Sequence, residues 1–310
     1  MSTPSTTLPT TRPAATGLPY LITAGLLWGT GGFSGTLLHH VTGLSPLAIA
    51  AYRLAVGGGL LAVVLLLTGR RLPRTRAAYV RVGTIGALTA IYQAAYFAAV
   101  ALTSISLATL ITIGSSPVIV LAVETVTGTR RLDRTVVLTL ALALAGLGLL
   151  VGLPTGGFGP AALLGGAGLA VLSATCFATM SLVCATPVAG LDELTTTGVG
   201  FSIGGVALVV IAVPTVSVGF TPTPTAFALV AFLGLVPTAI AYVCYFRGLP
   251  AAGPGTAALL ALLEPLVGSV LAAVFLHQEL GMVGWCGAAL LMTAVALAGR
   301  TATRRTVTHQ

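Results

Sequence analysis

The sequence predicts an all-α integral membrane protein whose ten transmembrane helices form two inverted five-helix repeats. Three observations lead to this prediction. Only 6% of the 310 residues are charged and 56% are hydrophobic, whereas a soluble domain carries roughly 25% charged residues. Apolar runs of about 20 residues, the length that crosses a bilayer, recur along the chain. The second half of the sequence also resembles the first half.

Short polar breaks divide the chain into ten spans. We expect them near residues 18–38, 46–68, 79–100, 104–126, 135–153, 161–184, 195–214, 225–246, 254–276 and 282–299. These runs are apolar all round, which argues against the alternating strands of a barrel. Residues 1–17 are rich in Ser, Thr and Pro and are expected to be a disordered tail. The next run is too long for the apolar part of a signal peptide, so it should remain as the first span.

The arginines predict the orientation of the spans. With ten spans, both tails and the connections after spans two and four share one face. They hold Arg12, Arg70, Arg71, Arg74, Arg76, Arg81, Arg130, Arg131, Arg134, Arg300, Arg304 and Arg305, joined by Arg247 after span eight. The connections on the opposite face hold no arginine. By the positive-inside rule, both termini of this multi-pass protein of the cell membrane are cytoplasmic.

An internal repeat appears when the chain is shifted by 148 residues. Gly86 then falls on Gly234, Leu60 on Leu208 and Pro117 on Pro265. We therefore expect a first five-helix repeat over 18–153, a second over 154–299 and a cytoplasmic tail over 300–310. Because five is odd, the second repeat would cross the membrane in the opposite sense. Inverted repeats that meet near the midplane are typical of secondary transporters, which work by alternating access.

Several short motifs resemble those of the EamA family of the drug/metabolite transporter superfamily. They are Trp28-Gly29, Ser45-Pro46, Tyr52-Arg53-Leu54, Leu102-Thr103, Ala108, Ser116-Pro117, Glu264-Pro265 and Glu279-Leu280. The resemblance extends from Leu18 to Gly299. It implies ten helices in two inverted repeats around a central cavity. It also implies an exporter of small metabolites such as amino acids or related compounds, or of toxic compounds.

One position departs from the family pattern. Arg131 stands where the family often has an acidic residue equivalent to Glu279, and the nearest acid is Glu124. A symmetric pair of terminal carboxylates is therefore not part of the expectation.

Two charged residues inside spans are the first candidates for substrate binding. A charge within a span costs about 2.5–3.5 kcal/mol on insertion scales, so each needs a reason. Glu264 precedes Pro265, which frees a backbone carbonyl, and is expected to face the cavity and bind an amino group or a proton. Its alternative role is a packed, hydrogen-bonded carboxyl. Arg53 could bind a carboxylate, extend to the outer interface or pair with Glu264.

Polar and aromatic side chains complete the predicted binding site. Tyr92 and Tyr96 share one face of span three beside Gln93, and Tyr242 and Tyr245 are similarly spaced on span eight. Aromatic rings with polar tips suit a ligand cavity. Interface or packing tyrosines are the alternative. Trp28 lies mid-span and should line the cavity, and Ser116 could offer its hydroxyl there. His39 and His40 are expected in the first outer loop.

Several classes of function have little support in the sequence. The arginines are spread over loops and tails rather than gathered on one folded surface, so no nucleic acid is expected as a partner. No phosphate-binding loop is present, and the driving force would be a proton or substrate gradient. An intramembrane enzyme acting on a lipid-linked substrate is the alternative, but His277-Gln278-Glu279 lacks the second histidine of a metal-binding helix.

The expected partners follow from this interpretation. They are a small-molecule substrate and the lipid bilayer, and the oligomeric state is left open with a monomer as one option. No cofactor and no metal are expected. The four cysteines lie inside predicted spans without a C-x-x-C pair and should pack as small hydrophobic residues.

Overall fold

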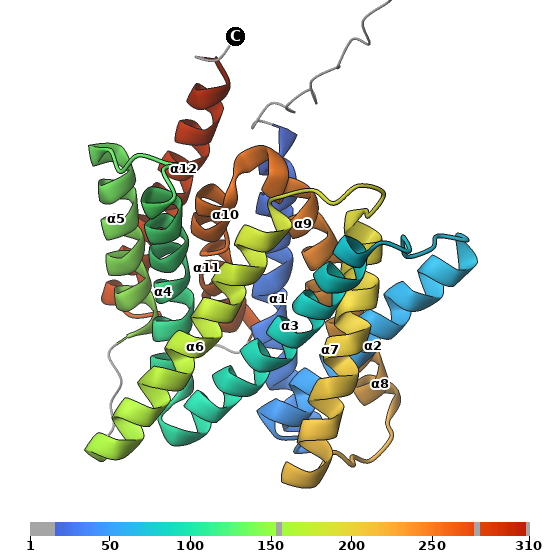
Figure 1. Cartoon of the computed structure of the whole chain (residues 1–310). Helices are drawn as coiled ribbons and strands as arrows, with labels where there is room; N and C mark the ends of the chain where they lie inside the picture. Colours follow the sequence, from blue (N-terminus) through green and yellow to red (C-terminus); the bar gives the residue numbers. More distant parts are fainter. Residues whose placement is uncertain (1–15, 153–156, 276–279, 308–310) are drawn as a thin grey trace, which may run out of the picture.

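The protein is a bundle of long helices (Figure 1). The computed structural model describes residues 16–152, 157–275 and 280–307. The elements are α1 (Leu18–Thr42), α2 (Pro46–Leu67), α3 (Arg76–Leu102), α4 (Ile105–Val126), α5 (Arg134–Val151), α6 (Pro160–Cys184), α7 (Glu193–Thr215), α8 (Pro224–Gly234), the π-helix η2 (Leu235–Ile240), α9 (Ala241–Ala252), α10 (Pro254–Leu260), α11 (Leu263–Phe275) and α12 (Met282–Val307). Strand pairing in these residues is limited to one isolated bridge between Val188 and Leu191.

The described part of the chain contains ten helical segments long and apolar enough to cross a membrane. Eight of them are single helices, whereas α8, η2 and α9 together make span eight and α10 with α11 makes span nine. The predicted ten-span architecture is confirmed. The predicted tail lies mostly outside the described residues, as does the boundary at 153/154 between the predicted repeats.

Side-chain caps explain where several helices begin. Hydroxyl or carboxylate oxygens accept a hydrogen bond from the backbone N–H three residues on, which satisfies one of the unpaired donors at a helix start. The capping residues are Ser45, Thr75, Ser104, Asp133, Asp192 and Thr223. The short Thr103–Ser104 connection between spans three and four thus ends in a defined cap rather than a longer loop.

Three predicted span ends fall well short of the helix end, and span ten is one of them, because α12 continues to Val307. Span one continues to Thr42, so His39 and His40 lie in its last turn and not in a loop. Span eight continues to Ala252, so Arg247 lies within α9 and not after it. The Arg247 guanidinium stacks over the ring of Tyr20 with 5.1 Å to the centroid. This cation–π contact lets a charged residue remain on the helix near the end of the span.

The outside of the bundle is apolar, as a lipid-facing surface must be. Leu164 is 74% exposed and Val206 and Val210 are each 67% exposed. Val206 and Val210 lie in the interior of α7, away from the loops, and Leu164 lies in the second turn of α6. Large apolar side chains at such positions would be unfavourable in water, so the surface is consistent with a multi-pass membrane protein.

The helices pack in a pattern that is preserved when the two halves are exchanged. In the first half α3 packs on α6 and α7, and in the second half span eight packs on α1 and α2. Likewise α4 packs on α6, as α11 of span nine packs on α1. The internal repeat in the sequence therefore corresponds to a repeat in the packing.

Glycines on α2 and α7 make similar close contacts with Gly234 and Gly86. A Cβ on Gly204 would lie 2.9 Å from the carbonyl oxygen of Gly86, and one on Gly57 would lie 2.8 Å from that of Gly234. The pair Gly86 and Gly234 is the match found in the sequence at a shift of 148. Small residues allow helix backbones in lipid to approach closely, so both positions have a structural reason to be glycine.

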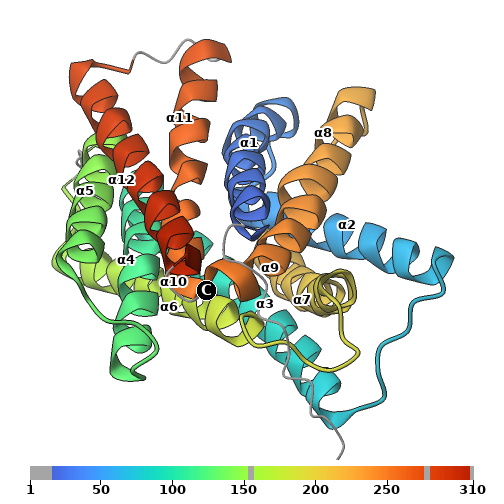
Figure 2. The same cartoon turned by 90° about the horizontal axis from the view of Figure 1, so that it is seen from above.

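In two places a helix packs against its counterpart in the other repeat: α2 packs on α7, and α5 packs on α12 (Figure 2). In the first pair Gly58 packs against Ser202, and Gly205 packs against Ala55. In the second pair a Cβ on Gly146 would lie 2.7 Å from the Leu291 nitrogen and 2.9 Å from the Gly287 oxygen. The neighbouring Gly59 takes no part in this packing, because it is exposed and an added Cβ there would meet no atom within 4 Å.

We predict that Gly146→Leu destabilises the protein because the new side chain would meet the backbone of α12. Overpacking typically costs about 1–3 kcal/mol, and backbone atoms leave little room to adjust. Thermal unfolding in detergent, followed by tryptophan fluorescence, should show a clearly lower midpoint. Gly59→Leu is the matched control and should change the midpoint little. Equal midpoints for the two variants would contradict the close packing of α5 on α12.

Candidate functional site

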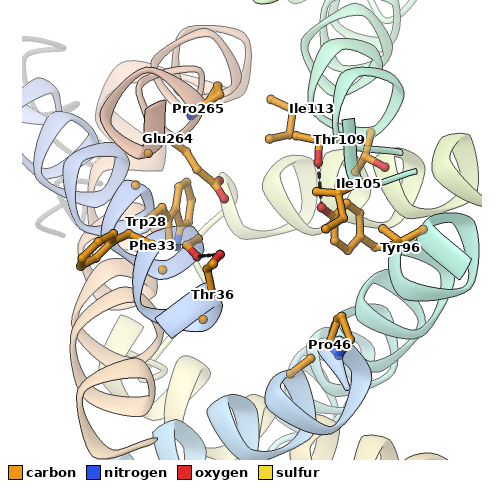
Figure 3. Close-up of a pocket in the computed structure, with 18 of the residues that line it drawn as sticks. Trp28, Phe33, Thr36, Pro46, Tyr96, Ile105, Thr109, Ile113, Glu264 and Pro265 are labelled. Carbon is orange, nitrogen blue, oxygen red and sulfur yellow. Dashed lines mark hydrogen bonds between the residues drawn. The ribbon is translucent and has the colours of Figure 1, made fainter. Parts of the chain in front are cut away.

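A cavity of about 700 Å³ lies between the two halves of the bundle (Figure 3). Its walls come from α1, α2, α3 and α4 of the first half and from α11 of the second, with two residues from α5, one from α8 and Leu280 just before α12. Ligand pockets are commonly about 300–1,000 Å³. The cavity is therefore large enough for a small metabolite.

The cavity occupies one half of the bundle's thickness. On α1 the lining residues run from Trp28, near the middle of the helix, to His39 in its last turn. On α2 and α4 they lie in the first half of the helix, at 46–53 and 105–113. The opposite ends of these helices contribute no lining residue. The cavity thus reaches the loops that contain residues 43–45 and 103–104, and it stops near mid-span.

Glu264 lies where span nine is interrupted. Helix α10 ends at Leu260, a turn follows, and α11 begins at Leu263. The Glu264 N–H donates to the Ala261 carbonyl oxygen at 3.0 Å, and Pro265 has no N–H to continue the α-helical pattern. The carboxylate therefore stands in the first turn of α11, where the helix dipole favours negative charge. Its side chain points into the cavity (Figure 3).

Span eight is also irregular beside the cavity. The π-helix η2 widens its backbone around Pro237, and Thr238 Oγ1 donates to the Leu233 carbonyl oxygen at 2.8 Å. Leu233 lines the cavity. Single-turn π-helical segments occur frequently at functional sites, because they move one side chain out of the α-helical register.

Arg53 and Glu264 line the same cavity without forming an ion pair. Among the described residues, ion pairs within 4.0 Å join Arg70 to Asp192 and Arg130 to Glu124. Arg53 and Glu264 are close enough to interact electrostatically. The Arg53 Nε is also buried without a hydrogen-bond partner. One positive and one negative group are thus both available on the wall of the cavity.

Aromatic rings close the inner end of the cavity. Trp28 lines the cavity, and the rings of Phe177, Tyr242 and Tyr245 pack behind it in the core. The centroids of Tyr242 and Tyr245 lie 4.9 Å from Trp28, and that of Phe177 lies 5.9 Å away. We call Trp28, Phe177, Tyr242 and Tyr245 the aromatic floor. Such edge-to-face packing contributes beyond the buried area and separates the cavity from the far side of the bundle.

A hydrogen bond fixes the wall formed by α3 and α4. The hydroxyls of Tyr96 and Thr109 lie 2.7 Å apart, as the dashed line between these helices shows (Figure 3). Because this bond uses the Tyr96 hydroxyl, the residue presents mainly its ring to the cavity. Ile105 and Ile113 beside it make this wall largely apolar.

Comparison with known proteins agrees with this geometry. The sequence model of the EamA-like transporter family matches twice, over residues 15–152 and 164–300. The chain belongs to the EamA-like transporter family. This membership makes it a membrane transporter of the drug/metabolite transporter superfamily. The two matches correspond to the two halves seen in the helix packing.

Two further proteins are similar to this EamA-like chain. The "Uncharacterized transporter YwfM" of Bacillus subtilis (strain 168) is 28% identical over 273 residues, which are 88% of this chain and 90% of the relative. A solved structure, described only as "Crystal structure of protein", superposes with a TM-score of 0.77 at 21% identity, over 93% of this chain and 98% of that chain. At that identity the structural likeness concerns the fold alone.

Six of the nine predicted site residues of this EamA-like transporter line the cavity. They are Trp28, Arg53, Tyr92, Gln93, Tyr96 and Glu264. Tyr242 and Tyr245 do not line it, because they pack behind Trp28 and are 3% and 1% exposed. The Tyr245 hydroxyl lies 2.8 Å from Ser181 Oγ. Ser116 is also buried away from the cavity. We therefore do not propose these three residues as direct substrate contacts.

The sequence interpretation missed the cavity-lining face of α1 in this EamA-like fold. Gly32, Gly35, Thr36 and His39 all line the cavity, together with Trp28. Their spacing from Trp28, by four, seven, eight and eleven residues, is that of one helical face. Extending this face from Trp28 would have found them. The assignment of His39 to a loop concealed the pattern.

Proposed function

We propose that this protein exports a small zwitterionic metabolite, such as an amino acid, by alternating access. One observation carries the proposal: a single cavity, open toward one end of the bundle, holds Arg53 and Glu264 unpaired with each other. A substrate with both a carboxylate and an ammonium group would satisfy both charges. Export is the direction that the family resemblance favours.

The arginine distribution supports an outward-open state. The two described ends of the chain lie on one side of the bundle, as do the connections from α2 to α3 and from α4 to α5 (Figure 1), which contain several arginines. We take this arginine-rich side as cytoplasmic, following the positive-inside rule. The cavity is lined from the opposite ends of the helices, so its mouth would face the outside of the cell.

The two repeats offer a route to the opposite state. Because each has five spans, the second would be inverted relative to the first, and an exchange of their conformations would move the opening to the other face. The aromatic floor and the packed helix ends beyond it would then have to separate. An inter-repeat contact that holds those ends together is therefore expected.

A buried contact between α4 and α10 fits this requirement. Glu124, near the end of α4, lies 3.6 Å from Arg130 Nη1, and both side chains are largely buried. Glu124 Oε1 also accepts a hydrogen bond of 3.2 Å from the Gly255 N–H, at the start of α10. We call Glu124, Arg130 and Gly255 the inner latch. It joins the first repeat to the second at the cytoplasmic side of the cavity.

Transport by purified protein in liposomes tests the proposal. Separate pools of labelled amino acids, nucleosides and small cations would be offered with and without a pH gradient. Saturable uptake from the amino-acid pool supports the proposal. The direction is tested in cells that are loaded with a dipeptide, which intracellular peptidases cleave to the amino acid, by measuring how fast the amino acid leaves the cells. Uptake of another pool only, or of none by demonstrably folded protein, would contradict it.

We predict that Glu264→Gln lowers amino-acid transport at least tenfold or removes its pH dependence. The variant keeps the side-chain size but loses the charge that binds an ammonium group or a proton. Hydrogen bonds to charged groups contribute about 1.5–3 kcal/mol, which corresponds to roughly 10- to 150-fold in affinity. Glu193→Gln, at the opposite end of the bundle, is the control. A wild-type rate with an unchanged pH profile would exclude this role for Glu264.

We predict that Arg53→Gln weakens binding of amino acids but not of the matching amines. The guanidinium is proposed to bind the carboxylate, which the amines lack. Competition binding to the purified protein should therefore show a loss of roughly 10-fold or more in the preference for the amino acid. Arg247→Gln, outside the cavity, should keep the preference. A parallel loss for both ligand types would assign Arg53 a structural role instead.

We predict that Gly255→Ala opens the inner latch. A Cβ at Gly255 would overlap Glu124 Oε2 and lie 2.5 Å from Arg130 Nη1, so the ion pair would have to move. Breaking a buried pair costs about 3–5 kcal/mol. The distance between spin labels at Val41 and Leu102, which lie beside the mouth of the cavity, reports whether the mouth is wide or narrow. In Gly255→Ala the fraction of molecules with the short distance should be severalfold larger.

The latch experiment has one control and a second latch variant, and every protein is measured with the native cysteines replaced. Gly148→Ala adds a methyl group with no neighbour within 4 Å and should leave the distances unchanged. Glu124→Gln keeps the size and the acceptor for Gly255 but removes the negative charge, and should shift the population in the same direction as Gly255→Ala. Unchanged distances in both latch variants would show that this contact does not hold the inner side closed.

A further inference from the structure

The glycines on the cavity face of α1 have different surroundings. A Cβ on Gly29 would lie 2.6 Å from Val267 Cγ1, and one on Gly31 would lie 3.2 Å from Pro237 Cβ. Packing against span nine and span eight therefore explains these two. A Cβ on Gly32 would meet no atom within 4 Å, and one on Gly35 would only touch Ile49 Cγ2 at 4.0 Å.

The fold gives no reason for glycine at Gly32. The residue lies inside α1 and is absent from the positive-φ glycines, so its backbone suits any residue. A glycine inside a helix costs about 1 kcal/mol relative to alanine. The missing side chain leaves space in one place, the cavity that Gly32 lines. That space is most simply explained by a ligand group that fills it.

A second observation indicates a ligand at the same place. Trp28 lies one helical turn before Gly32, lines the same cavity and is 5% exposed. Its indole Nε1–H has no hydrogen-bond partner in the described part of the protein. Buried donors without a partner are rare and require an explanation. Near a cavity, a bound ligand or its water provides one.

The wall across from α1 is largely apolar, and its Tyr96 and Thr109 hydroxyls are hydrogen-bonded to each other. Figure 3 shows Thr36 of α1 on one side of the cavity and Tyr96, Ile105, Thr109 and Ile113 on the other. Glu264 points into the space between them. A substrate whose charged groups lie at Glu264 and Arg53 could place its uncharged part between Gly32 and this apolar wall.

We infer that Gly32 determines substrate specificity by setting the size of the apolar group that the transporter accepts. The inference rests on the proposed function and makes it narrower: the substrate is a zwitterion with a bulky apolar side chain. Gly35, one turn nearer the mouth, widens the same chamber. Gly29 and Gly31 maintain the helix contacts that hold this chamber in place.

Gly32→Leu and Gly59→Leu form a matched pair that tests the inference. Each replaces an exposed helical glycine where an added Cβ would have no neighbour within 4 Å, but only Gly32 lines the cavity. Transport of glycine, alanine, leucine and phenylalanine would be measured in liposomes, each beside its matching amine. Gly32→Leu should lower the ratio of bulky to small substrates at least tenfold, Gly32→Ala should lower it less, and Gly59→Leu should leave it unchanged.

The panel distinguishes failure of the inference from failure of the proposed function. Transport of amines but not of amino acids by the wild type would refute the zwitterion proposal, while the size ratio within the amines would still test Gly32. An unchanged ratio in folded Gly32→Leu, or an equal loss for small and bulky substrates, would overturn the inference. So would a wild-type protein that transports neither series.

Discussion

The bilayer has no water with which to satisfy backbone hydrogen bonds, and the rest of this structure depends on that constraint. A spanning segment must be a continuous helix unless the interruption is buried or lines a cavity. The irregular segments described within the spans, η2 and the turn between α10 and α11, both adjoin the cavity. The turn in span nine is also what places Glu264 at a helix start, so one local irregularity provides both the space and the charge.

Charge is scarce in this protein, and each buried instance has a distinct environment. Arg53 and Glu264 share the cavity, where a ligand can complete their interactions. Glu124 and Arg130 instead pair with each other between α4 and α10. In the sequence, Glu124 is only the acid nearest to an altered family position. In the structure its carboxylate accepts a hydrogen bond from Gly255 and so joins the two repeats.

Most of the fold could be predicted because lipid makes hydrophobic length a direct signal. The ten spans followed from the length of the apolar runs. The cavity residues Glu264 and Arg53 were found because they are charged residues within apolar spans. What could not be predicted depends on helix rotation and depth. Tyr242 and Tyr245 have the same composition and spacing as cavity tyrosines, yet the packing of span eight turns them behind Trp28. Gly32 and Gly29 are identical in sequence terms, and only their neighbours distinguish free space from close contact.

The pairing of α2 with α7 and of α5 with α12 has a consequence for the origin of the repeats. Where a helix packs against its own counterpart, the interface is isologous, so one surface must complement itself. If the two halves descend from one shorter chain, every substitution on that surface would once have appeared on both sides of the contact. Glycine meets this requirement easily, because it has no side chain and two helix surfaces with glycine at the contact can approach without a clash. Gly58 and Gly205 lie within one residue of the 148-residue shift and pack against Ser202 and Ala55, so these two glycines would then descend from one glycine of that shorter chain.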